Sequence, residues 1–166
     1  MDRIVNREAL EQVRETSKAQ IENSRCRILI CAGTGCLAGG SGQIYERMCE
    51  LVKEHPDVEV HFGPEIAHGD GEIGVKKSGC HGFCEMGPLM RIEPQGILYT
   101  KVKPEDCDEI FHRTIEKGDV IRHLLFKQDG IEYRKQEEIP FYKKQTRNVL
   151  RNCGHIDAEH IQEYIS

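Results

Sequence analysis

The spacing of apolar residues changes along the chain and predicts where helices and strands alternate. Residues 5–23 repeat apolar side chains at helical spacing, with charged residues elsewhere, and predict an N-terminal helix. The stretch CRILI at 26–30 alternates with a period of two and predicts a strand. A glycine-rich turn follows. Ser41 then opens an amphipathic stretch that predicts a helix ending near His55, next to Pro56.

Five further segments complete the central pattern. VEVHF at 58–62 predicts a second strand, and a short strand is expected near 73–76. LMRI at 89–92 and ILYTKV at 97–102 predict a β-hairpin across a turn that contains proline and glycine. The stretch 103–118 predicts a helix with a proline in its first turn and a glycine at its end. This order predicts an α/β fold with a small mixed sheet flanked by helices.

The C-terminal part of the chain is more polar. Residues 126–145 have the composition of a linker. Two short helices are expected at the end of the chain, one at 141–154 that Gly154 ends and one at 157–166 that Asp157 caps. The predicted organisation is an N-terminal helix at 1–25, a central domain at 26–126, and a linker with short helices at 127–166.

Charge and hydropathy exclude several classes of function. The net charge at pH 7 is −5 and no basic stripe stands out, which argues against a nucleic-acid partner. No apolar run approaches the length of a membrane-spanning helix, and the first residues lack the apolar core of a signal peptide. We therefore expect a soluble, cytoplasmic protein without a membrane segment.

Eight cysteines are present, and four of them lie in two glycine-rich loops. Their spacing is C-x4-C, a gap of 43 residues and C-x3-C, formed by Cys31, Cys36, Cys80 and Cys84. Four thiolates are the ligand set of a [2Fe–2S] cluster, and glycines let the backbone point N–H groups at its sulfurs. Nearby apolar side chains are expected to exclude water from this site, namely Leu37, Phe83, Met86 and Pro88.

Other interpretations of the same loops stay open. Residues 33–38 also fit the dinucleotide turn G-x-G-x-x-A, with Glu59 about twenty residues later, although the chain continues into a hairpin instead of a third parallel strand. The four thiolates could bind a structural zinc ion, for which C-x2-C spacing is preferred. A redox-active dithiol would lack the usual C-x-x-C motif.

The remaining candidate residues have simpler roles. Four cysteines are expected to pack at core or boundary positions, because free cysteine is among the most buried residue types. These are Cys26, Cys49, Cys107 and Cys153. His81, inside the second cysteine loop, is expected beside the metal ligands or facing solvent, because four thiolates already complete the ligand set.

The two motifs resemble a known family. CAGTGC followed by GCHGFCEMGP is similar to the motif pair of the thioredoxin-like [2Fe–2S] ferredoxins, and GILYTKVKPED resembles their hairpin and last helix. The resemblance covers residues 26–118, and the glycine-rich segment 61–75 departs from it by its length. It implies a thioredoxin-like ferredoxin fold with one cluster near the surface. Its ligands would be Cys31, Cys36, Cys80 and Cys84.

The end of the chain resembles a segment found in one kind of redox subunit. HLLF, and then IPFYKKQTRNVLRNCGHIDAEHIQEYI, are similar to the segment that joins such a domain to the flavin domain of NADH-binding flavoprotein subunits. Those subunits belong to NAD(P)-linked, often electron-bifurcating [FeFe]-hydrogenases and to relatives of respiratory complex I. The resemblance implies FMN and NAD(P)H only in a downstream domain absent from this chain. The partners of this chain would be other iron–sulfur and flavin subunits. The sequence is also compatible with a homodimer.

Two functions from different classes follow from the sequence. The first is one-electron transfer through a single cluster within an NAD(P)H-linked oxidoreductase or hydrogenase complex. The chain would then not be catalytic alone, although its parent subunit would be an NAD(P)H-dependent oxidoreductase. The second is an interaction module without redox activity, stabilised by zinc.

Overall fold

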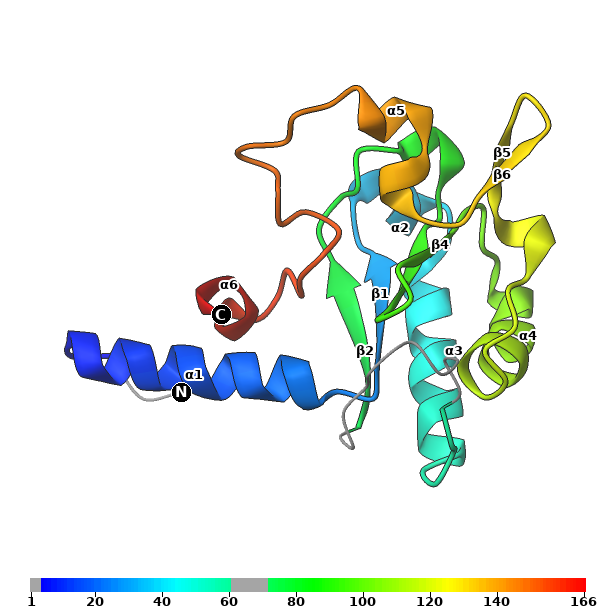
Figure 1. Cartoon of the computed structure of the whole chain (residues 1–166). Helices are drawn as coiled ribbons and strands as arrows, with labels where there is room; N and C mark the ends of the chain where they lie inside the picture. The colour runs from blue at the N-terminus through cyan, green and yellow to red at the C-terminus, as the bar shows by residue number, and fades with distance from the viewer. Residues whose placement is uncertain (1–3, 61–71) are drawn as a thin grey trace.

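The predicted strand at 26–30 forms the centre of the sheet. In the computed structural model, which describes residues 4–60 and 72–166, β1 (Cys26–Cys31) pairs in parallel with β2 (Ile73–Ser78). On its other edge β1 pairs antiparallel with β3 (Met90–Glu93), which forms a hairpin with β4 (Ile97–Tyr99). The strand order is β2-β1-β3-β4 (Figure 1). The expected mixed sheet and hairpin are therefore confirmed.

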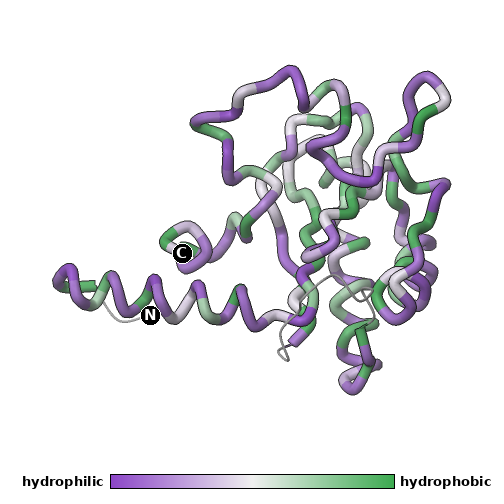
Figure 2. The backbone as a smooth tube through the Cα atoms, viewed as in Figure 1, coloured by the Kyte–Doolittle hydropathy of each residue, from purple (hydrophilic) through white to green (hydrophobic). Residues whose placement is uncertain are grey.

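One face of the sheet is covered by the two central helices. These are α3 (Ser41–Glu54) and α4 (Cys107–Glu109), the latter preceded by a 3-10 turn at Pro104–Asp106 and continued by a π-helical turn at Ile110–Ile115. Ile44, Met48 and Leu51 follow helical spacing along α3 and are buried against the strands. Hydrophobic residues are concentrated in the middle of the molecule in Figure 2, as this packing requires.

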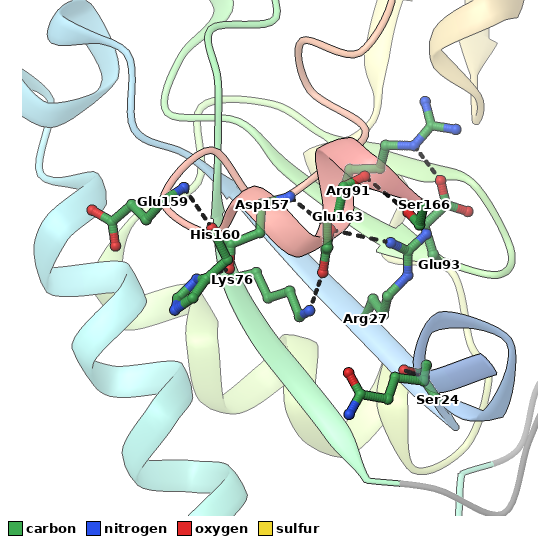
Figure 3. A network of polar contacts seen from close by, with 11 residues as sticks. Ser24, Arg27, Lys76, Arg91, Glu93, Asp157, Glu159, His160, Glu163 and Ser166 are labelled. Carbon is green, nitrogen blue, oxygen red and sulfur yellow. Dashed lines mark hydrogen bonds and ion pairs between the residues drawn. The ribbon is translucent and has the colours of Figure 1, made fainter. Parts of the chain in front are cut away.

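The opposite face of the sheet is unusually charged and is covered by the end of the chain. Arg27 of β1 and Lys76 of β2 both pair with Glu163 of α6 (Ile161–Ile165), whose side chain is almost fully buried. Arg91 of β3 pairs with Glu93 and with Glu137. Figure 3 shows Arg27 and Lys76 meeting Glu163 between the sheet and α6. Paired charges allow polar strand residues to be covered without leaving a buried ion alone.

The N-terminal helix is present but lies beside the main body. α1 (Arg7–Asn23) begins at Asn6, whose side-chain oxygen accepts a hydrogen bond from the Ala9 amide at 2.8 Å. Figure 1 shows α1 extending away from the sheet, next to α6. Its expected apolar face is only partly covered, since Leu10 remains 40% exposed.

The predicted strand at 58–62 is not confirmed. Residues 58–60 form no strand, and His61 and Phe62 lie outside the described residues. The two edges of β1 pair instead with β2 and β3. Val60 is nevertheless buried against the core, which explains the apolar pattern. The short strand expected near 73–76 is confirmed as β2.

The C-terminal region also differs from expectation. A hairpin replaces the predicted linker, with β5 (Phe126–Gln128) and β6 (Ile131–Tyr133) joined through Asp129 and Gly130, which both have positive φ. The helix expected at 141–154 is reduced to α5 (Pro140–Lys143). The last helix begins at Ile161 and is preceded by His160, so Asp157 is not its N-cap. Within the described part of the chain, no helix is long and apolar enough to span a membrane.

Candidate metal centre

The two cysteine loops meet because they follow parallel strands. Cys31 is the last residue of β1, and Cys36 follows it in α2 (Thr34–Ala38). Cys80 comes two residues after β2, and Cys84 begins the 3-10 turn Cys84–Met86. Parallel strands end at the same edge of a sheet, and Cys31 is in register with Ser78. The sheet therefore brings the two loops together.

All four predicted thiols are neighbours in the structure. Cys80 Sγ lies 3.7 Å from Cys84 Sγ, and the Cys31 thiol forms hydrogen bonds with those of Cys36 and Cys80. Among the described residues, no three Cys, His, Asp or Glu side chains converge as a single metal ion would require. These contacts link the four sulfurs from Cys36 through Cys31 and Cys80 to Cys84, and four thiolates are the ligand set of a [2Fe–2S] cluster.

Three glycines allow the loops to approach this closely. A Cβ atom on Gly33 would lie 2.9 Å from Cys80 Cβ, and one on Gly35 would lie 3.4 Å from Cys84 Cβ. A Cβ atom on Gly87 would lie 2.7 Å from Cys36 Sγ. The space beside Gly33 is thus filled by a cysteine, so this turn offers no room there for the pyrophosphate of a dinucleotide.

Backbone amides point at the sulfurs, as the glycine content predicts. The Gly82 amide donates to Cys80 Sγ at 3.3 Å, and backbone hydrogen bonds reach Cys31 from Gly33 and His81. A hydrogen bond from the Cys36 thiol, together with these amides, lowers the pKa of Cys31 to about 6 despite its burial. Cys31 is therefore largely a thiolate at neutral pH, the form that binds metal.

The site is closed on one side and open on the other. Cys31 and Cys36 are buried, Cys80 is half-buried and Cys84 is exposed. Phe83 and Met86 pack with the apolar cluster that surrounds the buried cysteines. Leu37 does not exclude water as expected, because its position on the short helix α2 leaves it 49% exposed. An electron would reach this centre most directly on the side of Cys84.

His81 is fixed between two polar partners and does not face solvent. Its side chain is fully buried, with Nδ1 2.8 Å from Gln136 Oε1 and Nε2 3.0 Å from Ser78 Oγ. Because the Gln136 oxygen can only accept, Nδ1 carries the proton and Nε2 accepts from the serine hydroxyl. Burial lowers the pKa of His81 to about 4, so the ring is neutral. The ring thereby positions the backbone amide that faces Cys31.

The C-terminal segment forms part of this site, which the sequence pattern did not indicate. The Tyr142 hydroxyl donates to the His81 carbonyl at 3.1 Å, and the Phe141 ring stacks on Phe83 with centroids 4.9 Å apart. A Cβ on Gly154 would lie 2.6 Å from His81 Nδ1. Apolar residues interrupting a polar stretch, as in IPFY, are the available signal for such a packed segment.

Replacing Gln136 tests this support of the second cysteine loop. In Gln136→Leu the buried Nδ1–H of His81 loses its acceptor, and we expect the free energy of unfolding to fall by about 1–3 kcal/mol. Urea unfolding followed by circular dichroism measures the change. Gln145→Leu is the control, since Gln145 is exposed and its side-chain amide donates to the carbonyl of Phe141. Equal stability of the two variants would contradict a structural role for Gln136.

The other four cysteines lie apart from the four-thiol cluster or at its edge. Cys26 and Cys107 are fully buried in the core. Cys49 and Cys153 are half-buried. Cys153 lies close to the second loop, with its Sγ 3.7 Å from the position of a Cβ on Gly79. The expected packing roles of Cys26 and Cys107 agree with these positions.

Comparison with known proteins identifies the family. The model of the thioredoxin-like [2Fe–2S] ferredoxin family matches residues 18–114. The chain belongs to this family. A 2Fe-2S ferredoxin of Clostridium pasteurianum is 31% identical over 104 residues, which cover 61% of this chain and 96% of that ferredoxin. One of Aquifex aeolicus is 27% identical over 93 residues, covering 56% and 74% of the two chains.

Solved structures support the same fold. The crystal structure of the wild-type thioredoxin-like [2Fe–2S] ferredoxin from Aquifex aeolicus matches with a TM-score of 0.51 at 22% identity, covering 63% of this chain and 99% of that one. An NAD+-reducing [NiFe]-hydrogenase gives a TM-score of 0.41 at 13% identity and is matched over 20% of its chain, too distant a likeness to support an inference. The predicted family and fold are thus confirmed.

Membership of this family makes the [2Fe–2S] cluster the cofactor of this protein and electron transfer its function. The donor set is compatible with that cofactor, because four thiols meet at one place and two of them, Cys31 and Cys80, receive backbone hydrogen bonds. The family match ends at residue 114, whereas Gln136, Tyr142 and Gly154 all contact the second cysteine loop. This ferredoxin therefore encloses its site partly with residues beyond the matched region.

Proposed function

We propose that the cluster is bound by Cys31, Cys36, Cys80 and Cys84, and that it passes single electrons between redox partners. The meeting of these four thiols at one edge of the sheet is the observation that supports this ligand set. When bound, a [2Fe–2S] cluster accepts and releases one electron. The thiolates would hold it, and the amides of Gly33, His81 and Gly82 would stabilise negative charge on the sulfurs.

We further propose that this electron transfer takes place within an NAD(P)H-linked redox complex, as in hydrogenases or relatives of respiratory complex I. The resemblance of the C-terminal stretch to the segment before a flavin domain supports this proposal, since that stretch also packs against the second cysteine loop. Residues 1–25 would then be a flanking helix, 26–126 the cluster domain, and 127–166 the connection toward a flavin- and NADH-binding domain.

The first test is spectroscopic. We expect protein purified anaerobically to hold two irons and two sulfides for each chain, as a [2Fe–2S] cluster requires, and to show an electron paramagnetic resonance signal after reduction with dithionite. Iron, sulfide and zinc are assayed on the same sample. A colourless protein with one zinc ion for each chain would contradict electron transfer and favour the interaction module instead.

A further inference from the structure

The open side of the metal centre carries an unusual distribution of charge. The chain as a whole has a net charge of −5, yet residues 139–156 contain no aspartate or glutamate. The same stretch holds four cations, namely Lys143, Lys144, Arg147 and Arg151. This segment lies against the second cysteine loop, and Figure 1 shows α5 at the same end of the molecule as α2. The surface beside the ligands is therefore basic on an acidic protein.

These cations have no acidic partner within the described part of the chain. Lys143 and Lys144 are exposed, and neither forms an ion pair there. Arg147 is half-buried, and its Nη1 atom is buried without a hydrogen-bond partner among the described residues. Its guanidinium faces the Tyr142 ring, with 5.9 Å between the central carbon and the ring centroid. Its Nη2 atom lies 3.8 Å from the position of a Cβ on Gly82.

Exposed apolar side chains lie beside the same opening. Phe141 is 43% exposed and stacks on Phe83, the residue before the exposed ligand Cys84. Leu37, the residue after the ligand Cys36, is 49% exposed. A docking surface needs apolar contacts to exclude water and surrounding charge to orient the partner. Glu85 is the one acidic residue in the loop 79–88, and it is exposed.

From these observations we infer that the surface formed by Leu37, Cys84, Phe141, Lys143, Lys144 and Arg147 is the docking site for an acidic one-electron carrier protein. The inference rests on the proposed function, because it needs the cluster at the four cysteines. Cations around the opening would attract the acidic partner, and apolar contacts would hold it next to Cys84. The reduced cluster would lose one electron and the oxidised metal of the partner would gain it.

Electron-transfer kinetics with two carriers of opposite charge test this surface. The protein is reduced with dithionite, freed of excess reductant, and mixed in a stopped-flow instrument with oxidised rubredoxin, a small acidic iron protein, or with oxidised cytochrome c, a basic one. In each reaction one electron leaves the cluster and reduces Fe³⁺ of the acceptor to Fe²⁺. We expect added salt to slow the reaction with rubredoxin and not that with cytochrome c, since salt screens attraction between opposite charges.

A charge-reversed double variant locates the effect. Lys143→Glu with Lys144→Glu is expected to lower the rate constant for rubredoxin about tenfold at low ionic strength. The control is Lys53→Glu with Lys117→Glu, which has the same net charge as the first double variant. Lys53 lies at the end of α3 that is far from the cysteine loops. We expect the control to change the rate constant by less than about twofold. Both lysines of the control are exposed and lack ion pairs within the described residues.

The outcomes separate the two proposals. Equal rates in the two double variants, or a reaction with rubredoxin that salt accelerates, would overturn the docking surface while leaving the cluster in place. Absence of iron and sulfide from the unmodified protein would instead overturn the proposed function, and it is measured before any kinetic experiment. Iron content and unfolding temperature of each variant are compared with the unmodified protein, so that lost cluster is not mistaken for lost docking.

Discussion

Replacing Cys31 by serine is expected to abolish the visible absorption of the bound cluster, or to reduce it to a small remainder. Cys31 is buried at the end of β1, its pKa is lowered toward the thiolate form, and backbone hydrogen bonds from Gly33 and His81 reach its sulfur. Serine keeps the size of the side chain but is a far poorer ligand for iron, because its hydroxyl does not ionise near neutral pH. Iron and sulfide content, with the visible spectrum, measure the loss.

A second cysteine provides the matched control for this substitution. Cys107 is equally buried, but its Sγ faces the carbonyls of Ile44 and Lys103 in the helical layer, each at 3.9 Å. Burial raises the pKa of this thiol to about 12, which keeps it protonated. Cys107→Ala should therefore retain two irons for each chain and an unchanged spectrum. Cluster loss in Cys107→Ala with retention in Cys31→Ser would show that the ligand set is wrong.

Adding one methyl group at Gly87 is expected to damage the site almost as severely. The Cβ of Gly87→Ala would lie 2.7 Å from Cys36 Sγ and 3.2 Å from the Cys84 carbonyl oxygen, and so would displace the sulfur of a proposed ligand. Overpacking of this kind costs about 1–3 kcal/mol. We expect the cluster to be lost at least about tenfold faster, because 1.4 kcal/mol corresponds to a factor of ten. Bleaching of the visible absorption in the presence of an iron chelator measures that rate.

Gly42 is the matched position for this substitution. It lies in the first turn of α3, and a Cβ added there would have no atom within 4 Å. Alanine is the better helix former by up to about 1 kcal/mol, so Gly42→Ala should unfold at the same temperature or slightly higher. Its cluster should bleach at the rate of the unmodified protein. Equal bleaching of Gly87→Ala and Gly42→Ala would contradict the crowding at Cys36.

The hairpin at 126–133 shows a limit of reasoning from composition. The overall polarity of the stretch FKQDGIEY predicts a linker, yet the stretch contains Asp-Gly between residues that alternate in polarity. Asp129 and Gly130 both adopt positive φ, the conformation that a two-residue hairpin turn requires. The Asp-Gly pair is therefore a hairpin motif that the sequence contains, and the average polarity of the stretch does not reveal it.

The sequence by itself determined the loops, strands and helix that depend on residues close together along the chain. Glycines and cysteines at fixed spacing define the two loops, and the period of apolar residues defines β1, α3 and the β3–β4 hairpin. These features depend on residues near one another along the chain, so a one-dimensional pattern contains them.

Only the tertiary structure decided which distant segments meet. The stretches at 58–60 and 73–78 both contain alternating apolar residues, but in the structure the later one pairs with β1 as β2, whereas 58–60 form no strand. Likewise, Gln136 and Tyr142 reach His81 across more than fifty residues, and this contact places a basic segment beside the cluster site of an acidic protein. Which segments meet depends on how all segments of the chain compete to pack against the same surfaces. The pattern of residues within one segment does not specify the outcome of that competition.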